Sequence, residues 1–430
     1  MTSRESILIR RGRVIDPAQK LDAEMDIVLS DARVTQIGLP GSLRGTPDHV
    51  IDAHGLVVTP GLVDLHVHLR QPGQGYKETI ASGTAAAAAG GFTSVCPMPN
   101  TTPVNDLPET TAWMQHPERG ALVNVFPIAA ATQGSEGRVL TDFRKLKLAG
   151  AVAISDDGKP ILDDGLMRRA LVLAHEVGLP VIQHAEDTRL TAGRPMNLGP
   201  TSFRLGLRGQ PASAEARVVE RDIALAAETG AHLHIAHIST AEALQAVRKA
   251  KRAGVQVTCE VAPHHFLFID EDIGDYNTNL KMNPPLRSAA DREAMLAGIA
   301  DRTIDAIATD HAPHARYEKN VEFDRAAYGI TGLEVALALA ITRLHRVKGV
   351  PLSHIVALLS TNPARIIARS GRGTLAKGSY ADVTIFDPKK RWTYDVSKSR
   401  SLSRNCPYDG IHLYGKVMYT IVAGEMIYGG

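Results

Sequence analysis

The middle of the chain alternates short apolar runs with longer helical segments, and this alternation restricts it to very few folds. We predict eight strands, at residues 61–68, 92–98, 124–131, 151–155, 180–185, 232–238, 256–262 and 305–310. Helical patterns lie between them, at residues 76–90, 165–178, 213–230 and 240–254, and these end in Gly, where a helix C-cap favours it. Such regular strand–helix units are typical of a parallel sheet.

Eight strand–helix units predict an α/β protein with a (β/α)8 TIM barrel over residues 61–371. Strands that are apolar on both faces suit a parallel sheet covered on both sides. A doubly wound open sheet is the alternative, but no Gly-rich phosphate loop follows the first strand. In a barrel, the active site lies at the carboxyl ends of the strands.

The two ends of the chain resemble each other and differ from the middle. Residues 6–60 and 380–430 give short β patterns separated by Asp, Gly and Pro turn signals. Neither end has enough strands for a sheet of its own. We therefore expect residues 1–60 and 372–430 to form one small composite β-sandwich domain beside the barrel.

Composition excludes several classes of protein. The chain has 48 Lys and Arg against 46 Asp and Glu and no basic block, which argues against a nucleic-acid partner. Three widely spaced cysteines make a disulfide framework improbable and favour a reducing compartment. No apolar stretch is long enough to span a bilayer, so we expect no membrane partner and a cytoplasmic location.

The segment GLVDLHVHLR, residues 61–70, ends an apolar strand with two histidines and an arginine on one face. Two buried imidazoles at this spacing, His66 and His68, would repel each other if protonated. A metal ion is the reason that we favour for their placement. The alternative is a pair of hydrogen-bonded structural histidines.

Other strand ends supply further metal ligands. They carry Asp156 and Asp157, His184, His237, and Asp310 followed by His311 and His314. Imidazole nitrogen and carboxylate oxygen suit Zn²⁺. Spacing alone does not decide among His232, His234 and His237, and we favour His237 because it lies nearest the end of its strand. Six histidines are left without a role: His175, His232, His264, His265, His345 and His354.

The number of ligands predicts more than one ion. Four histidines and two aspartates exceed the three protein ligands of a simple catalytic zinc site. Two ions bridged by a carboxylate would use them all and would lower the pKa of a bound water toward neutrality. A metal-bound hydroxide would then attack an amide carbonyl, with Asp310 as general acid and base.

Seven motifs together resemble the dihydroorotases of the amidohydrolase superfamily, of the bacterial type with an aspartate in place of a carboxylated lysine. The motifs are DLHVHLRQPG, GTAAAAAGGFTSVCPMPNTTPV, SDDGKP, QHAED, HIAHIST, KMNPPLR and ATDHAPH. HxH alone indicates only the superfamily, whereas HxHxR with MPNT and KMNPPLR is far more specific. The resemblance extends from about residue 61 to residue 332.

The resemblance implies a set of metal ligands. His66 and His68 would bind the first zinc ion with Asp310, and His184 and His237 the second. Asp157 would bridge the two, because its spacing to His184 matches the family pattern, whereas spacing alone does not decide between Asp156 and Asp157. A carboxylated lysine at Lys159 is the minority alternative. One or two zinc ions per chain fit the family, and we favour two.

The resemblance also implies substrate-binding residues. Arg70 offers a planar fork for the substrate's α-carboxylate. The other residues implied are His68, Asn100, Asn283, His314, Tyr328 and Gly329. This chain departs from the family at the expected contacts from Tyr328 and Gly329, because the family often has Pro-Phe-Gly where this chain has Ala327, Tyr328 and Gly329. Residues 315–327 are polar and form a long loop, which predicts a mobile lid.

The implied activity is the reversible cyclisation of N-carbamoyl-L-aspartate to L-dihydroorotate in de novo pyrimidine biosynthesis. One rival is another cyclic amidohydrolase, an allantoinase or hydantoinase. The other is a non-catalytic partner of aspartate carbamoyltransferase, which loss of metal ligands would indicate. By family alone we expect a homodimer, or a complex with that carbamoyltransferase.

Overall fold

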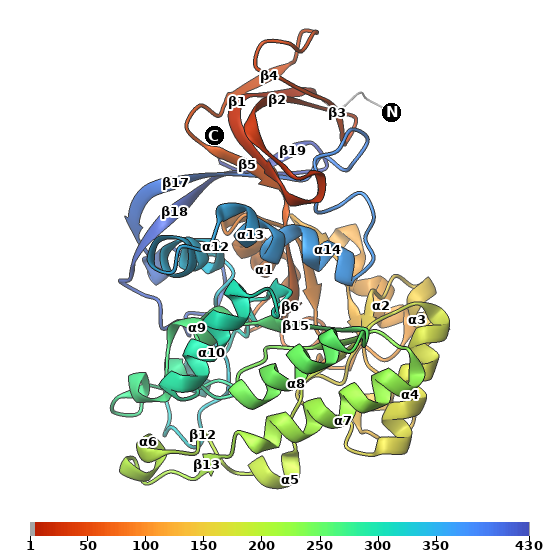
Figure 1. Ribbon diagram of the computed structural model, residues 1–430, viewed down its shortest axis with the longest axis vertical. Coiled ribbons are helices and arrows are strands. Elements are labelled where there is room, and N and C mark those ends of the chain that lie inside the picture. Colours follow the sequence, from red (N-terminus) through yellow and green to blue (C-terminus); the bar gives the residue numbers. More distant parts are fainter. Residues whose placement is uncertain (1–4, 430) are drawn as a thin grey trace.

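A closed barrel of parallel strands forms the centre of the computed structural model, which describes residues 5–429 (Figure 1). Its strands are β6 (Leu62–Val67), β7 (Phe92–Pro97), β8 (Asn124–Val125), β9 (Ile128–Ala129), β10 (Ala153–Ile154), β11 (Val181–Gln183), β14 (Leu233–Ile235), β15 (Val257–Val261) and β16 (Ala306–Ile307). β8 and β9 are two parts of the predicted strand 124–131, separated by Phe126 and Pro127. A parallel bridge between Val67 and His311 joins the last strand to the first, as the predicted (β/α)8 barrel requires.

Helices cover the outside of the barrel. The longer ones are α1 (Ile80–Ala89), α2 (Pro108–Gln115), α3 (Phe143–Leu148), α4 (Asp164–Val177), α7 (Ser213–Thr229), α8 (Ala241–Arg252) and α10 (Ala289–Ala300). Residues 336–347 and 352–366 form the last helical layer, which contains α12 (Ala336–Leu339), α13 (Leu352–Val356), α14 (Asn362–Ile366) and π-helical turns. None of the described helices is both long and apolar enough to cross a membrane.

Local sequence explains where these helices begin and end. In α4 the Asp163 side chain accepts from the Leu166 amide, and Gly178 ends the helix in a left-handed conformation with φ 65°. Leu166, Ala170 and Ala174 are buried at helical spacing against the barrel. Thr240 caps α8 in the same way, by accepting from the Ala243 amide.

Both ends of the chain contribute to one eight-stranded sheet, as predicted. Its strands are β1 (Ile7–Asp16), β2 (Leu21–Ser30), β3 (Arg33–Gly38), β4 (His49–Asp52), β5 (Val57–Pro60), β17 (Val383–Thr393), β18 (His412–Val422) and β19 (Glu425–Tyr428). β5 joins the two ends, since it is parallel to β1 and antiparallel to β17. The chain passes directly from β5 into β6, so the sheet lies beyond the amino end of that barrel strand (Figure 1).

The core of the barrel continues into the sheet. Phe386 of β17 and Val417 of β18 belong to the same buried cluster as Leu62 and Phe92 of the barrel. The sheet also has a core of its own, which includes Ile9, Ile27, Val58, Ile385 and Ile421. The two parts of the molecule therefore share apolar surface that neither buries alone.

A small subassembly lies at the far end of the barrel from the sheet (Figure 1). It consists of α5 (Thr188–Thr191), β12 (Met196–Asn197), α6 (Pro200–Arg204) and β13 (Gly209–Gln210). Met196 and Leu205 pack there with Leu280, Leu286 and Phe323, which come from the loops after β15 and β16. These loops surround the carboxyl ends of the strands, where the predicted site lies.

Candidate active site

The end of β6 places two histidines of the HxHxR motif next to the end of β16. His68 Nε2 lies 3.1 Å from Asp310 Oδ1, and His66 Nε2 lies 3.5 Å from the same oxygen. Both histidines are buried. Asp310 and Arg70 have left-handed backbones, with φ of 48° and 60°, which non-glycine residues rarely adopt. Such strain is concentrated at functional sites.

Asp157 lies at the centre of the predicted ligands. Its Oδ1 is 3.5 Å from His66 Nε2, 3.7 Å from His184 Nδ1 and 3.8 Å from His237 Nε2. Burial raises the pKa of this carboxyl, but the charge of His66 and the nearby imidazoles of His237 and His68 hold it well below its usual range. Asp157 is therefore ionised, and its negative charge lies close to these imidazoles.

His184 and His237 meet on the other side of Asp157. His184 follows β11 and His237 follows β14, and His184 Nδ1 lies 3.0 Å from His237 Nε2. His237 is also left-handed, with φ 28°. The structure thus brings together all six predicted ligands: His66, His68, Asp157, His184, His237 and Asp310.

The arrangement fits bound metal. Within residues 5–429, three combinations of these side chains each gather three ligand atoms within 4.8 Å of one another. His66 Nε2 and Asp157 Oδ1 are buried and have no hydrogen-bond partner among the described residues. Burial lowers the pKa of His66, but Asp310 and Asp157 raise it well above its ordinary value. The two carboxylates therefore favour a positive charge beside His66. A bound metal ion would provide that charge in place of a proton on the ring.

Asp156 and Lys159, the two alternatives to Asp157, do not join the cluster of predicted ligands. Asp156 Oδ1 accepts hydrogen bonds from the Ala131 and Thr132 amides at 2.9 and 3.0 Å. This carboxylate therefore stabilises the backbone after β9. Lys159, the minority candidate for a carboxylated lysine, is exposed and lies outside the buried cluster.

His234 does not join the ligands but supports one of them. Its Nε2 lies 3.0 Å from Glu260 Oε2, and the other oxygen of Glu260 lies 3.1 Å from His66 Nδ1. Thr258 Oγ1 is 2.8 Å from His234 Nδ1 and 2.9 Å from His232 Nε2. Burial raises the pKa of Glu260, but hydrogen bonds from His234 and His66 lower it to about 2. An ionised Glu260 therefore links His66, one of the predicted ligands, to His234 inside the barrel.

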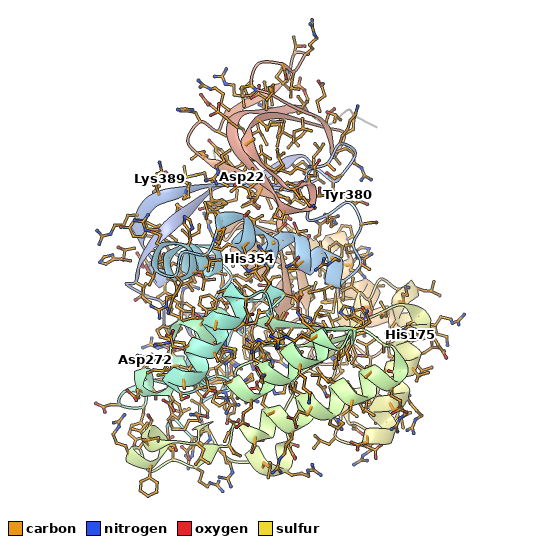
Figure 2. All side chains as sticks on the ribbon, viewed as in Figure 1. Asp22, His175, Asp272, His354, Tyr380 and Lys389 are labelled. Carbon is orange, nitrogen blue, oxygen red and sulfur yellow. The ribbon has the colours of Figure 1, made fainter. Side chains whose placement is uncertain are left out.

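The other unassigned histidines lie outside the cluster of six ligands. His175 is exposed on α4, whereas His354 on α13 donates from Nε2 to the Ile299 carbonyl at 2.8 Å (Figure 2). His345 and His265 contact the carbonyls of Val350 and Pro284. His264 is buried, and its ring nitrogens have no partner among the described residues.

The predicted substrate residues Arg70, His314, Tyr328 and Gly329 lie together. Arg70 NH2 is 3.2 Å from His314 Nε2, and Arg70 Nε donates to the Pro313 carbonyl at 3.0 Å. His314 Nε2 also lies 2.8 Å from the Tyr328 carbonyl. Burial lowers the pKa of His314 to about 2, and the charge of Arg70 adds to this effect, so the ring is neutral. The Gly329 amide donates to the Lys281 carbonyl at 3.0 Å.

The two predicted asparagines contact predicted ligands or their neighbours. Asn100 Oδ1 is 2.9 Å from His68 Nδ1, and its amide nitrogen donates to Asp157 Oδ2 at 3.0 Å. Asn283 donates to Glu186 Oε2 at 2.8 Å, and Glu186 contacts His184 Nε2 at 2.8 Å. Each asparagine therefore orients one side of the ligand cluster.

The loop predicted as a lid has buried anchors. It contains α11 (Arg316–Lys319), Glu318 forms an ion pair with Lys77 at 2.8 Å, and Phe323 is buried. Its motion stays a prediction.

Sequence reasoning missed four residues of the site: Glu186, Glu260, Lys319 and Asn405. Glu260 had a local signal, since it is the one carboxylate within the apolar strand 256–262, and Glu186 lies two residues after His184. Lys319 and Asn405 come from a loop and from the C-terminal segment. Lys319 lies in the loop 315–327 predicted as a lid, but nothing in that loop distinguishes this lysine from its neighbours, and no pattern near Asn405 indicates a role.

Comparison with known proteins identifies similar chains. Residues 55–243 match a family model described as Dihydro-orotase-like. The chain is 50% identical to a dihydroorotase of Citrifermentans bemidjiense over 98% of this chain and 99% of that protein. It is 49% identical to a dihydroorotase of Solibacter usitatus, over 98% of this chain and 97% of that one.

Solved structures of similar fold include hydantoinases. An L-hydantoinase (dihydropyrimidinase) from Arthrobacter aurescens superposes with a TM-score of 0.88 at 23% identity, covering 99% of this chain and 96% of that one. A D-hydantoinase (dihydropyrimidinase) from Thermus sp. gives 0.82 at 26% identity, covering 98% and 94%. At 23% identity, the similarity to the L-hydantoinase concerns the fold alone.

Proposed function

Because the chain belongs to the dihydroorotase family, we propose that it interconverts N-carbamoyl-L-aspartate and L-dihydroorotate in pyrimidine biosynthesis. The observation that carries this proposal is the position of Arg70. Its guanidinium lies at the edge of a buried cluster of metal ligands, beside a neutral His314. A hydrolytic centre with a carboxylate-binding arginine suits a cyclic amide that carries a carboxylate.

We propose that the cluster holds two zinc ions. His66, His68 and Asp310 would bind one, His184 and His237 the other, and Asp157 both, because its Oδ1 faces histidines from each side. Imidazole and carboxylate donors suit this metal. Bound there, zinc would activate a water molecule at neutral pH and polarise the amide carbonyl.

Asp310 is positioned to move the proton. Its Oδ1 is 3.1 Å from His68 Nε2, and the nearby histidines hold its pKa below the ordinary range despite burial. An ionised carboxylate at this place accepts the proton of the attacking water in the hydrolytic direction. It then returns the proton to the ring nitrogen as the amide bond breaks. In the cyclising direction the same carboxylate acts in reverse order.

Arg70, Asn100, Asn283 and His314 bind and orient the substrate in this proposal. The fork of Arg70 would take the α-carboxylate. Tyr328 and Gly329 would contribute backbone contacts, and the present bond from the Gly329 amide to Lys281 would then be exchanged for one to substrate.

Other assignments have less support. An allantoinase or hydantoinase would not need Arg70 beside the ligands, and a non-catalytic homologue would not keep all six. We further propose a cytoplasmic location, which is consistent with three free, buried cysteines. A homodimer or a complex with aspartate carbamoyltransferase is proposed from the family alone.

The decisive experiment follows dihydroorotate hydrolysis by ultraviolet absorbance, with metal analysis of the same sample. We expect activity with about two zinc ions per chain, and loss of both activity and metal in Asp157→Ala. Asp156→Ala is the matched control, and its metal content should be unchanged. Full metal occupancy without activity on dihydroorotate would overturn the substrate assignment, and allantoin and hydantoins would be assayed next.

A further inference from the structure

Lys319 is a buried lysine whose ammonium group forms its hydrogen bonds, among residues 5–429, with backbone carbonyls. It lies at the end of α11 with 5% of its surface exposed. Its Nζ donates to the carbonyls of Ala327 at 2.8 Å, Gly329 at 3.1 Å and Lys281 at 3.4 Å. An ammonium group has three N–H donors and no acceptor, so these three carbonyls use its whole capacity.

The three carbonyls belong to the two loops that carry the proposed substrate residues. Lys281 begins the segment KMNPPLR, which contains Asn283, and Ala327 and Gly329 flank Tyr328. The Gly329 amide donates in turn to the Lys281 carbonyl at 3.0 Å. The ammonium group thus fixes the loop after β15 and the loop after β16 relative to each other.

We propose that Lys319 is a positioning residue that sets the affinity for substrate by holding these two loops together. This inference rests on the proposed function of the same site. Lys319 has no contact with the six metal ligands, so its effect concerns binding of substrate and not the metal-dependent step. Removing it should raise KM and leave kcat and metal content close to those of the wild type.

The surroundings of Lys319 suit an ammonium group despite its burial. Burial lowers the pKa of Lys319 to about 7, with a further contribution from the nearby Lys281, whereas Glu318 opposes the shift. A buried ammonium group is costly unless it is fully hydrogen-bonded. A hydrophobic residue of equal length would avoid this cost but would remove one donor from each of the three carbonyls, and the Ala327 carbonyl would lose its sole donor among the described residues.

Asn405 reaches the same carbonyl from the C-terminal segment. Its side-chain amide donates to the Gly329 carbonyl at 3.0 Å and to the Ala312 carbonyl at 2.9 Å. Its Oδ1 accepts the His314 amide at 3.0 Å. Gly329 is therefore held from two directions, and Asn405 offers an independent variant of the same positioning.

A pocket of about 480 Å³ gives small molecules access to Lys319. Its walls include Lys319, Asn405, His314, Arg316 and Arg404. In a Lys319→Ala variant, a primary alkylammonium ion could enter from this pocket and restore the missing donors. A neutral alcohol of the same length could fill the space but would supply only one O–H donor in place of three N–H donors.

The experiment measures kcat, KM for dihydroorotate, zinc content and thermal stability of wild type, Lys319→Ala, Lys319→Met and Asn405→Ala. We expect KM to rise about tenfold to a hundredfold in the lysine variants, with kcat changed less than about threefold. Propylammonium should lower the KM of Lys319→Ala toward the wild-type value, and 1-propanol should not. Lys319→Met retains the hydrophobic stem should the alanine variant fail to fold.

Lys251→Ala is the matched control. Lys251 Nζ also donates to a backbone carbonyl, that of Thr303 at 2.6 Å, but it lies at the end of α8 and serves no substrate loop. This variant should keep its KM whatever its stability. An unchanged KM in Lys319→Met, a loss of zinc with KM unchanged, or equal rescue by propanol would overturn the proposal. Lack of wild-type activity on dihydroorotate would instead refute the proposed function.

Discussion

Glu260 determines which ring nitrogen of His66 is free for a metal. Its ionised carboxylate only accepts hydrogen bonds, so the proton of His66 lies on Nδ1, 3.1 Å from Glu260 Oε1. A metal ion that replaces the other proton would therefore bind at Nε2, which faces Asp157 and Asp310. Carboxylates that orient metal-binding histidines in this way also increase their basicity.

We predict that Glu260→Gln weakens zinc binding about 10-fold to 100-fold. A neutral amide keeps the size of the side chain but removes the charge that fixes the His66 tautomer. Competition with a chromophoric chelator measures the affinity without reference to activity. Asp305→Asn is the control, because the Asp305 carboxylate accepts the amide of Cys259, the residue before Glu260, and its other partner is Lys251 and not a predicted metal ligand. Equal affinities of Glu260→Gln and wild type would contradict this role.

The small residues of helix α1 allow the helix to pack closely against a distant part of the backbone. Gly90 follows this helix, and a Cβ atom placed there would lie 2.0 Å from the Leu333 carbonyl oxygen. That neighbour is backbone at the start of the last helical layer and cannot rotate away. The small residues of GTAAAAAGG therefore permit close packing of two elements far apart in the sequence.

We expect Gly90→Ala to destabilise the protein by about 1–3 kcal/mol, through displacement of α1 from the 333–334 backbone. The helical φ of −85° at Gly90 is allowed for alanine, so the cost comes from packing. Chemical denaturation at fixed zinc concentration measures it. Gly254→Ala is the comparison, since a Cβ there meets nothing within 4 Å and only its φ of +80° is unfavourable. A smaller loss in Gly90→Ala than in Gly254→Ala would be the opposite of the expected order.

At the scale of the molecule, the sheet from both chain ends completes the barrel. Phe386 and Val417 cover Leu62 and Phe92, and Asn405 holds the backbone of His314. Ser403 donates to the Lys77 carbonyl at 2.7 Å. This bond joins the C-terminal segment to the loop between β6 and α1. The proposed division at residues 60 and 372 therefore describes architecture and not independent folding units.

We predict that residues 61–371 expressed alone are insoluble or lack cooperative unfolding, because their shared apolar surface is exposed. The full chain should unfold in one calorimetric transition. Two well-separated transitions in the full chain, or a soluble and cooperatively folded 61–371 fragment, would show that the barrel is independent.

Much of this molecule follows from local sequence. The eight strands, the capped helices and the HxHxR motif are encoded in short segments, because strand period, helix capping and turn chemistry act over a few residues. Barrel geometry then requires strand ends to meet at one rim, so His66, His184 and Asp310 could be grouped before their distances were known.

Only the tertiary structure decided which of several nearby histidines joins the site and which distant segments contact one another. His237 faces Asp157 while His234 faces Glu260, a choice made by side-chain directions across three strands and not by spacing along one. Lys319 and Asn405 reach one carbonyl from positions 86 residues apart because the C-terminal segment returns to the barrel rim. Such contacts depend on how the whole chain closes, and no local period or motif records them.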